Sequence, residues 1–263
     1  MGKLERKLSS SQMIILGFAA VILLGALLLM LPVSSKSGEI TPFLDCLLTS
    51  TSAVCVTGLV VYDTAAHWTV FGQAIIIVLI QIGGMGVITV AAAITMAAGK
   101  KISLMQRSTM QDAISAPQVG GIVRFTGFIL KGIVIIELLG AAIMAPVFIG
   151  DYGFGEGLWM AVFHSISAFC NAGFSTLPGG MSNPAVMQEH NLLYVTLGLL
   201  IALGGIGFPI LVNLYETVAY YLGYLKWRGL HRAGRFRQKV HLYNLNTKIV
   251  LVATGILLVG GTL

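Results

Sequence analysis

The sequence predicts an all-α integral membrane protein made of repeated helix–half-helix–pore-loop–helix units, with two units and the first helix of a third. Hydrophobic residues make up 56% of the 263-residue chain and charged residues 10%, whereas about a quarter of the residues in soluble domains are charged. An octapeptide also occurs twice, as SAVCVTGL at 52–59 and SAFCNAGF at 167–174, 115 positions apart (167 − 52). Such internal repetition indicates a duplicated structural unit.

Five apolar stretches supply the predicted membrane helices. A helix rises 1.5 Å per residue, so about 20 apolar residues cross a hydrocarbon core of roughly 30 Å. The opening stretch is longer than the apolar segment of a cleaved signal peptide, so we expect it to stay in the mature protein. The stretches lie at 13–31, 70–98, 122–149, 192–222 and 249–263.

A second shared motif supports the duplication. GGMG at 83–86 and GGIG at 204–207 follow the two octapeptides in the same order. We therefore divide the chain into a first helix–pore-loop–helix repeat at 1–98, a cytoplasmic linker at 99–121, a second repeat at 122–225, a basic cytoplasmic linker at 226–248 and the first helix of an incomplete third repeat at 249–263.

Positive charge predicts the orientation in the cell membrane. Fifteen of the 16 Lys and Arg residues lie within 1–7, 99–131 and 226–248, and Lys36 is the exception. The positive-inside rule places these regions and the N-terminus in the cytoplasm, and the connections at 33–69 and 150–191 outside. The outer connections carry six acids, which would concentrate cations. The pI of about 9.3 is then a property of the inner surface, and we expect no nucleic-acid partner.

Two segments of the outer connections, at 42–53 and 157–169, are apolar but too short to cross a membrane. The first has about 12 residues, on the order of 18 Å of helix, and so reaches about halfway. Thr41 can cap its free amides, and Pro42 suits its first position. Each segment is followed by irregular backbone at membrane depth, which survives only where protein buries it or where it lines water. Two matched loops therefore favour a central aqueous path.

The loops after the half-helices suit a cation. A half-helix entering from outside points its partly negative end at the membrane centre, and the carbonyls after it can replace a hydration shell. Glycine is needed where successive carbonyls face one way, because it takes positive φ without strain. An ordinary re-entrant loop with a turn glycine is the alternative, and two loops in register favour the pore. The predicted ion-binding residues are Val56, Thr57, Gly58, Asn171, Ala172 and Gly173.

The glycine runs in the helices after the loops have two interpretations. They can act as gating hinges, or they can let neighbouring helices approach closely. We favour packing, with Pro209 kinking the second helix. The residues are Gly83, Gly84, Gly86, Gly204, Gly205 and Gly207.

Two polar features stand in apolar surroundings. Glu137 lies in the middle of a predicted span, and an acid at that depth is a functional-site candidate; it could pair with a polar group from a repeat beyond this sequence. His164 with Ser165 and Ser167 resembles part of a serine-hydrolase site. No oriented Asp accompanies them, and the equivalent Ser52 has no His nearby, so packing of the half-helix is the better interpretation. We expect no enzyme activity.

Four motifs together resemble the Trk/Ktr/HKT superfamily of potassium transporters. They are TGL at 57–59, NAGF at 171–174, QIGGMG at 81–86 and RSTMQDA at 107–113. The chain is most similar to the Ktr-type membrane subunit, because it begins directly with the first helix. The resemblance covers essentially the whole chain.

The resemblance implies uptake of potassium, with sodium as a further candidate, through a channel-like pore with a filter of backbone carbonyls. It implies one filter glycine per repeat, K⁺ as the transported ion and no bound cofactor. It also implies a cytosolic nucleotide-binding regulatory subunit of the RCK type on the basic inner face, and a homodimer in the plasma membrane. Anionic lipid is the alternative partner of the basic segment at 226–240.

Two questions keep alternative answers: how the filter is completed, and by which mechanism the protein transports its substrate. The family has four repeats, and a carbonyl filter must surround its ion, so we expect the native chain to continue for roughly two more repeats. A dimer that completes the ring is the alternative. A secondary transporter with parallel repeats and a mid-membrane substrate site is the alternative function. It predicts several buried charges, and only Glu137 qualifies.

Overall fold

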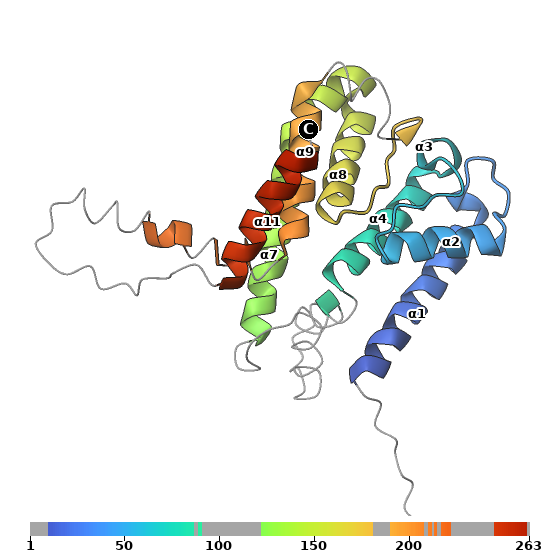
Figure 1. Cartoon of the computed structure of the whole chain (residues 1–263). Coiled ribbons are helices and arrows are strands. Elements are labelled where there is room, and N and C mark those ends of the chain that lie inside the picture. Colours follow the sequence, from blue (N-terminus) through green and yellow to red (C-terminus); the bar gives the residue numbers. More distant parts are fainter. Residues whose placement is uncertain are drawn as a thin grey trace, which may run out of the picture. The chain divides into compact units, whose positions relative to one another are not determined.

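A computed structural model describes residues 10–86, 89–90, 122–180, 190–207, 210–211, 213–214, 217–221 and 245–261. The chain divides into two compact units, 1–201 and 202–263, which are described separately. The named elements of the described part are all helices (Figure 1), so the predicted all-α class is confirmed. The linker at 99–121, most of that at 226–248, the motif at 107–113 and Pro209 lie outside the described residues.

The helices of unit 1 within residues 10–86 form the first group, which is built mainly of one long helix and two shorter ones. Helix α1 (Ser10–Leu29) has 20 residues, about 30 Å, and α2 (Phe43–Val54) has 12, about 18 Å. The 3₁₀ turn η1 (Pro32–Ser34) precedes α2, and α3 (Thr64–His67) precedes α4 (Val70–Met85). Helices α1, α2 and α4 contact one another in pairs (Figure 1). The bounds of α2 agree with the half-helix predicted at 42–53.

The start of α2 differs from the prediction. Its N-cap residue is Pro42, and no side chain caps its free amides. The hydroxyl of Thr41 lies 3.0 Å from Nε2 of His67 instead. The predicted cap is therefore wrong, because a tertiary contact with α3 takes the hydroxyl that the local pattern assigned to α2.

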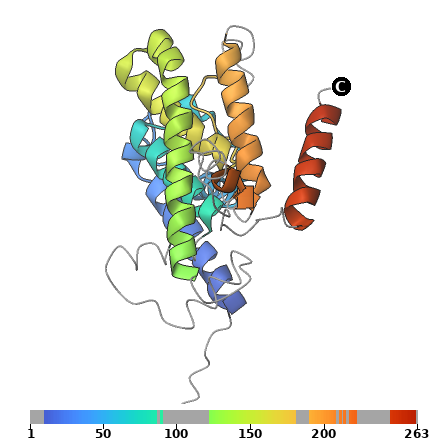
Figure 2. The ribbon, with the colours of Figure 1, turned by 90° about the vertical axis from the view of Figure 1, so that its left-hand side faces the viewer.

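A second group begins with α7 (Ile122–Tyr152), a 31-residue helix with Pro146 inside it. Helix α8 (Phe154–Phe169) follows almost at once and folds back beside α7, as the yellow and green ribbons of Figure 2 show. It starts three residues before the predicted half-helix at 157–169, because Gly153 turns the chain with a φ of 80°. Gly157 then makes the close approach possible, since a Cβ there would overlap the carbonyl group of Phe148.

The single helices predicted over 70–98 and 192–222 are interrupted at matching places. Helix α4 ends at Met85, and Gly86 follows with a φ of 82°. Helix α9 (Asn191–Ile206) is followed by Gly207 with a φ of 88°. A residue with positive φ ends the α-helical hydrogen-bond ladder, and glycine takes this conformation at little cost. Continuity across these glycines was therefore the wrong prediction.

Two helices in the described part are long and apolar enough to cross a membrane, at Ser11–Leu29 and Thr126–Tyr152. Helices α4 and α9 are apolar but have 16 residues each. In unit 2, α11 (Leu245–Gly261) begins four residues before the predicted helix at 249–263. Among the residues that the structure describes, full spanning length is thus observed for two of the five predicted spans.

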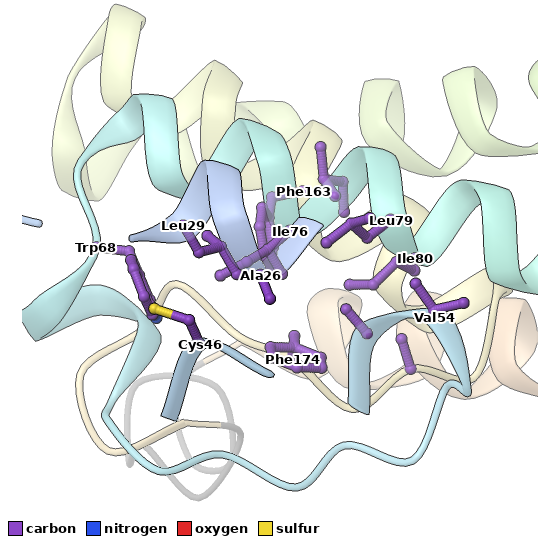
Figure 3. Packing of buried hydrophobic residues seen from close by; sticks show 13 residues of the cluster. Ala26, Leu29, Cys46, Val54, Trp68, Ile76, Leu79, Ile80, Phe163 and Phe174 are labelled. Carbon is purple, nitrogen blue, oxygen red and sulfur yellow. The ribbon is translucent and has the colours of Figure 1, made fainter. Parts of the chain in front are cut away.

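The core of unit 1 lies among α1, α2 and α4 and includes side chains from the second group. Trp68, Ile76 and Leu29 are buried there together with Phe163 of α8 and Phe174 of the following loop (Figure 3). Burying a Phe side chain contributes about 1.5–3 kcal/mol. Apolar burial therefore joins the two groups directly.

The two groups also share contacts at equivalent positions. The Ser50 hydroxyl donates to the carbonyl of Ile22 at 2.7 Å. The Ser165 hydroxyl, 115 positions later, donates to the carbonyl of Glu137 at 2.6 Å, and Glu137 is itself 115 positions after Ile22. In both groups, this bond fixes the half-helix against the long helix before it.

Candidate functional site

Both loops leave their half-helices through the same turn. Cys55 and Cys170 are the C-cap residues of α2 and α8. The next residues, Val56 and Asn171, have φ values of 56° and 59°. Positive φ is uncommon outside glycine, and for a β-branched residue such as Val56 it is an outlier that the surrounding structure must hold.

The serine shared by the two octapeptides holds each loop. The carbonyl of Ser52 accepts from the amide of Thr57 at 3.0 Å, and that of Ser167 accepts from the amide of Ala172 at 2.8 Å. The Ser167 hydroxyl also donates to the carbonyl of Phe174 at 2.6 Å. In the first copy, the Thr57 hydroxyl donates to the Ser52 hydroxyl at 3.0 Å. The sequence assigned Ser167 to packing of the half-helix and gave neither serine a part in holding the loop, although their recurrence in register was the available signal.

The predicted filter glycines lie against each other. Gly58 and Gly173 have φ values of 75° and 73°. A Cβ on Gly58 would lie 2.9 Å from the carbonyl oxygen of Ala172, and a Cβ on Gly173 would lie 3.3 Å from the Cα of Gly58. The structure therefore brings Gly58, Ala172 and Gly173 together. Ala172 is fully buried as a residue, and since its methyl side chain has no oxygen, its carbonyl is the group through which it could bind an ion.

The glycine run of α4 reaches the base of both loops. A Cβ on Gly83 would overlap the carbonyl of Val54, and one on Gly84 would lie 2.7 Å from Sγ of Cys170. These two glycines thus serve close packing. Gly86 and Gly207 take positive φ at the helix ends, as described above, while Gly204 and Gly205 lie in the last turn of α9.

Glu137 has its partner within the described part. Nε2 of Gln81 donates to both carboxylate oxygens, at 3.0 and 3.2 Å. A partner is thus present within this sequence, whereas the sequence alone allowed one from a further repeat. No role was assigned to Gln81 from the sequence, and the available signal was an amide side chain within an apolar helix.

His164 is a packed residue of α8. Its Nδ1 lies 2.8 Å from the carbonyl oxygen of Met160, which can only accept, so Nδ1 carries the proton. Nε2 then accepts from the hydroxyl of Ser175 at 2.9 Å. Since the hydroxyls of Ser165 and Ser167 donate to backbone carbonyls, these residues do not form a nucleophile–base pair.

A cavity of about 250 Å³ lies beside the second loop. Each residue that lines the cavity has an equivalent in the first group. The equivalent lies 115 positions earlier for residues of α8 and the loop, as in the octapeptides (167 − 52 = 115), and 121 positions earlier for residues of α9, as in the glycine runs (204 − 83 = 121). Three of these equivalents, Ala53, Ile76 and Ile80, belong to a buried cluster that also contains Phe163, Ala172 and Phe174, and a fourth, Val56, is partly buried and packs against that cluster. The second group thus has a cavity where the first has packed side chains. The cavity is lined by His164, Ser167, Ala168, Asn171, Gly173, Phe174, Leu197 and Ile201.

On the predicted external side, Asp63 joins the two outer connections. Its Oδ1 accepts from the amides of Ala65 and Ala66, and its Oδ2 accepts from the amide of Gly179 at 2.9 Å. Burial raises the pKa of this carboxyl, but the three amides and the charge of Lys36 outweigh burial, so the pKa lies below its ordinary value. The carboxylate is therefore stabilised in its charged form. The sequence contained no signal for the contact with Gly179.

A second polar cluster lies next to Asp63. The Tyr62 hydroxyl donates to Oδ2 of Asp45 at 2.8 Å, and the Tyr62 ring stacks on His67 with centroids 4.1 Å apart. Burial lowers the pKa of His67, against the opposing charge of Asp45. Two of the six predicted external acids are thus engaged in hydrogen bonds here.

Hydropathy and the helical fold place this chain in the class of all-helical membrane proteins. The profile of the TrkH family, described as cation transport protein, matches residues 5–259. The chain therefore belongs to the TrkH family of cation transport proteins.

Similar curated proteins carry names of the same kind. The chain is 38% identical over 259 residues to the potassium/sodium uptake protein NtpJ of Enterococcus hirae, covering 98% of this chain and 52% of that protein. It is 40% identical over 210 residues to the Ktr system potassium uptake protein B of Bacillus subtilis, covering 78% and 45%. It is 34% identical over 252 residues to the protein of that name in Vibrio alginolyticus, covering 95% and 50%. The chain spans about half the length of these relatives.

Proposed function

We propose that this chain contributes two loops to a channel-like filter through which potassium enters the cell, with sodium as an alternative cargo. The observation that carries the proposal is the matched pair of loops, in which positive φ recurs at Val56 and Asn171 and again at Gly58 and Gly173. Repeated backbone geometry of this kind suits coordination by carbonyl oxygens. The names of the relatives, which include potassium and sodium uptake, support the cargo.

Two loops in contact form only part of a ring around an ion, so further loops are needed. The cavity beside the second loop supports this step. In the first group, the equivalents of three lining residues lie in a buried cluster that also contains Phe163, Ala172 and Phe174 of the neighbouring group. We propose that another unit of the same kind fills this cavity, supplied either by a longer chain or by a second copy.

The distribution of Lys and Arg residues supports an orientation of the filter in the membrane. The proposed filter opens toward the outer connections, with the N-terminus and basic segments in the cytoplasm. A nucleotide-binding regulatory subunit on that basic face and a homodimeric assembly belong to the same proposal. They are supported by the names of relatives that belong to a Ktr system.

A secondary transporter gains no support from the described residues, where Glu137 is the only carboxylate among the buried side chains.

The test is replacement of either filter glycine by serine in the assembled transporter. A Cβ at a φ near 75° is strained, and at Gly58 it would also approach the Ala172 carbonyl. A left-handed conformation costs a non-glycine residue roughly 1–2 kcal/mol, so we expect the preference for K⁺ over Na⁺ to fall about tenfold. The matched control is Gly198→Ser, because a Cβ there meets no atom within 4 Å. Unchanged K⁺/Na⁺ preference in both filter variants would remove these glycines from the filter.

A further inference from the structure

Glu137 connects three helices of unit 1. Its side chain lies against α4, where it accepts both hydrogen bonds from Gln81. Its backbone carbonyl accepts from Ser165 of α8 at 2.6 Å. One residue of α7 therefore fixes both the helix after the first loop and the half-helix before the second.

The fold itself does not require an acid at this position. The equivalent residue of the first group is Ile22, whose carbonyl accepts the corresponding bond from Ser50 at 2.7 Å. An isoleucine thus supports the same backbone contact. Glu137 is 7% exposed, and burial of a carboxylate among apolar helices is unfavourable unless it is hydrogen-bonded. The replacement of the isoleucine of the first group by a glutamate in the second group therefore needs a reason other than packing.

The partner of Glu137 leads to the second loop. Gln81 and Gly84 are three residues apart on α4 and so lie on one face of the helix. Gly84 packs against Cys170 at the base of the loop. Sγ of Cys170 lies 4.0 Å from Oε1 of Gln81, at the long end of a thiol hydrogen bond. The amide of Gln81 therefore contacts the carboxylate at one end and the loop base at the other.

We propose that Glu137 is a positioning residue for ion selectivity, which holds Gln81 so that α4 supports the second loop at Cys170. This inference rests on the proposed function of the loops as a filter. Glu137 does not touch the ion. It acts by restricting the position of Gln81, and through Gln81 the turn that contains Asn171 and precedes Gly173.

The first test measures K⁺ and Na⁺ uptake by the assembled transporter. Glu137→Ile places the first-group residue in the second group, and Gln81→Leu removes the other partner. Loss of a hydrogen bond to a charged group should lower the K⁺/Na⁺ preference about tenfold in each variant. The double variant should fall no further, because the residues act as a pair. Leu138→Ile is the matched control, since Leu138 is the exposed neighbour of Glu137 on α7.

Conservative replacement separates positioning from charge. Glu137→Gln keeps an oxygen that can accept from Gln81, so we expect it to keep a K⁺/Na⁺ preference within about twofold of the wild type. A loss as large as that of Glu137→Ile would overturn the positioning role in favour of a direct effect of charge. Preserved preference in Glu137→Ile, where Gly173→Ser loses it, would also overturn the inference while leaving the filter proposal intact.

The second test does not depend on transport. N-ethylmaleimide alkylation of Cys170, followed by mass spectrometry of its peptide in the membrane-embedded protein, reports how firmly the loop base is held. Glu137→Ile and Gln81→Leu should raise the rate severalfold relative to Cys46, which is fully buried in the core. Unchanged alkylation of Cys170 in both variants would show that the pair does not hold the loop base, whatever the filter variants do.

Discussion

Nε1 of Trp159 donates a 2.7 Å hydrogen bond to Oε1 of Gln73, a residue 86 positions earlier in the chain. Gln73 is 6% exposed, and its Nε2 donates to the carbonyls of Trp68 and Thr64 at 3.2 and 3.4 Å. The oxygen and the nitrogen of the buried Gln73 amide thus both form hydrogen bonds, and the bond from Trp159 joins the half-helix α8 to the start of α4.

Replacement of Trp159 by Phe should destabilise the protein. The variant keeps an aromatic ring but leaves the buried Oε1 of Gln73 without its donor, which costs about 1–3 kcal/mol. The measurement is the thermal unfolding midpoint of the detergent-solubilised protein. Leu158→Phe is the control, because Leu158 is 42% exposed. Equal midpoints for Trp159→Phe and the wild type would contradict the importance of this bond.

Acidification should weaken the contact between the outer connections. The pKa of Asp63 is lower in the folded protein than its ordinary value of 3.8, so its contribution to stability is complete above the unfolded-state pKa and is lost as the pH falls through the folded-state pKa. We expect the unfolding midpoint of the wild type to fall below about pH 4, and the midpoint of Asp63→Asn to fall less steeply. Glu39→Gln controls for loss of one external carboxylate. Parallel curves for the wild type and Asp63→Asn would contradict this prediction.

The adjacent glycines of α4 should tolerate alanine unequally. In Gly83→Ala the new methyl group meets the backbone of Val54, whereas in Gly84→Ala it meets the side chain of Cys170. Overpacking costs typically about 1–3 kcal/mol, and we expect Gly83→Ala to lie at the upper end because a backbone cannot rotate away. The unfolding midpoint again reports the loss.

A double variant checks the contact at Gly84. Cys170→Ala removes the Sγ atom that the new methyl group would meet, so it should restore part of the stability that Gly84→Ala loses. Gly198→Ala, which has open space around its Cβ, should leave the midpoint unchanged or raise it. Additive losses in the Gly84→Ala/Cys170→Ala variant would argue against the contact.

The Ser167 hydroxyl should stiffen the second loop. It is buried and donates to the carbonyl of Phe174 at 2.6 Å, so Ser167→Ala should lower stability by about 1 kcal/mol. Amide hydrogen exchange in the loop should become faster. Thr51→Ala is the matched control, because that hydroxyl bonds within its own half-helix, to the carbonyl of Leu47. Unchanged exchange in the loop would contradict the role of Ser167.

Orientation can be tested by cysteine labelling from the external medium. The charge distribution predicts that a cysteine at Ser37 reacts with a membrane-impermeant thiol reagent and that a cysteine at Ser103 does not. The native thiols are first replaced, so that only the introduced cysteine reports. The reverse labelling pattern would overturn the proposed topology.

Local sequence was sufficient for the features that local chemistry controls. Hydropathy predicted the all-helical membrane class, because a long helix with apolar side chains is more stable in the hydrocarbon core of a membrane than in water. The length of the segment at 42–53 predicted the half-helix α2. The recurrence of glycine predicted positive φ at Gly58 and Gly173, because a missing Cβ is a property of the residue alone.

Tertiary structure decided the features that depend on distant partners. Local capping rules assigned Thr41 to α2, but its hydroxyl meets His67. Composition predicted unbroken helices past Gly86 and Gly207, although glycine tolerates both a helical and a left-handed backbone. Gln81 and Glu137 are 56 positions apart, and no periodicity links them. Such pairs form only after packed helices bring two polar groups together away from water, where each group must bond to whichever partner the fold supplies.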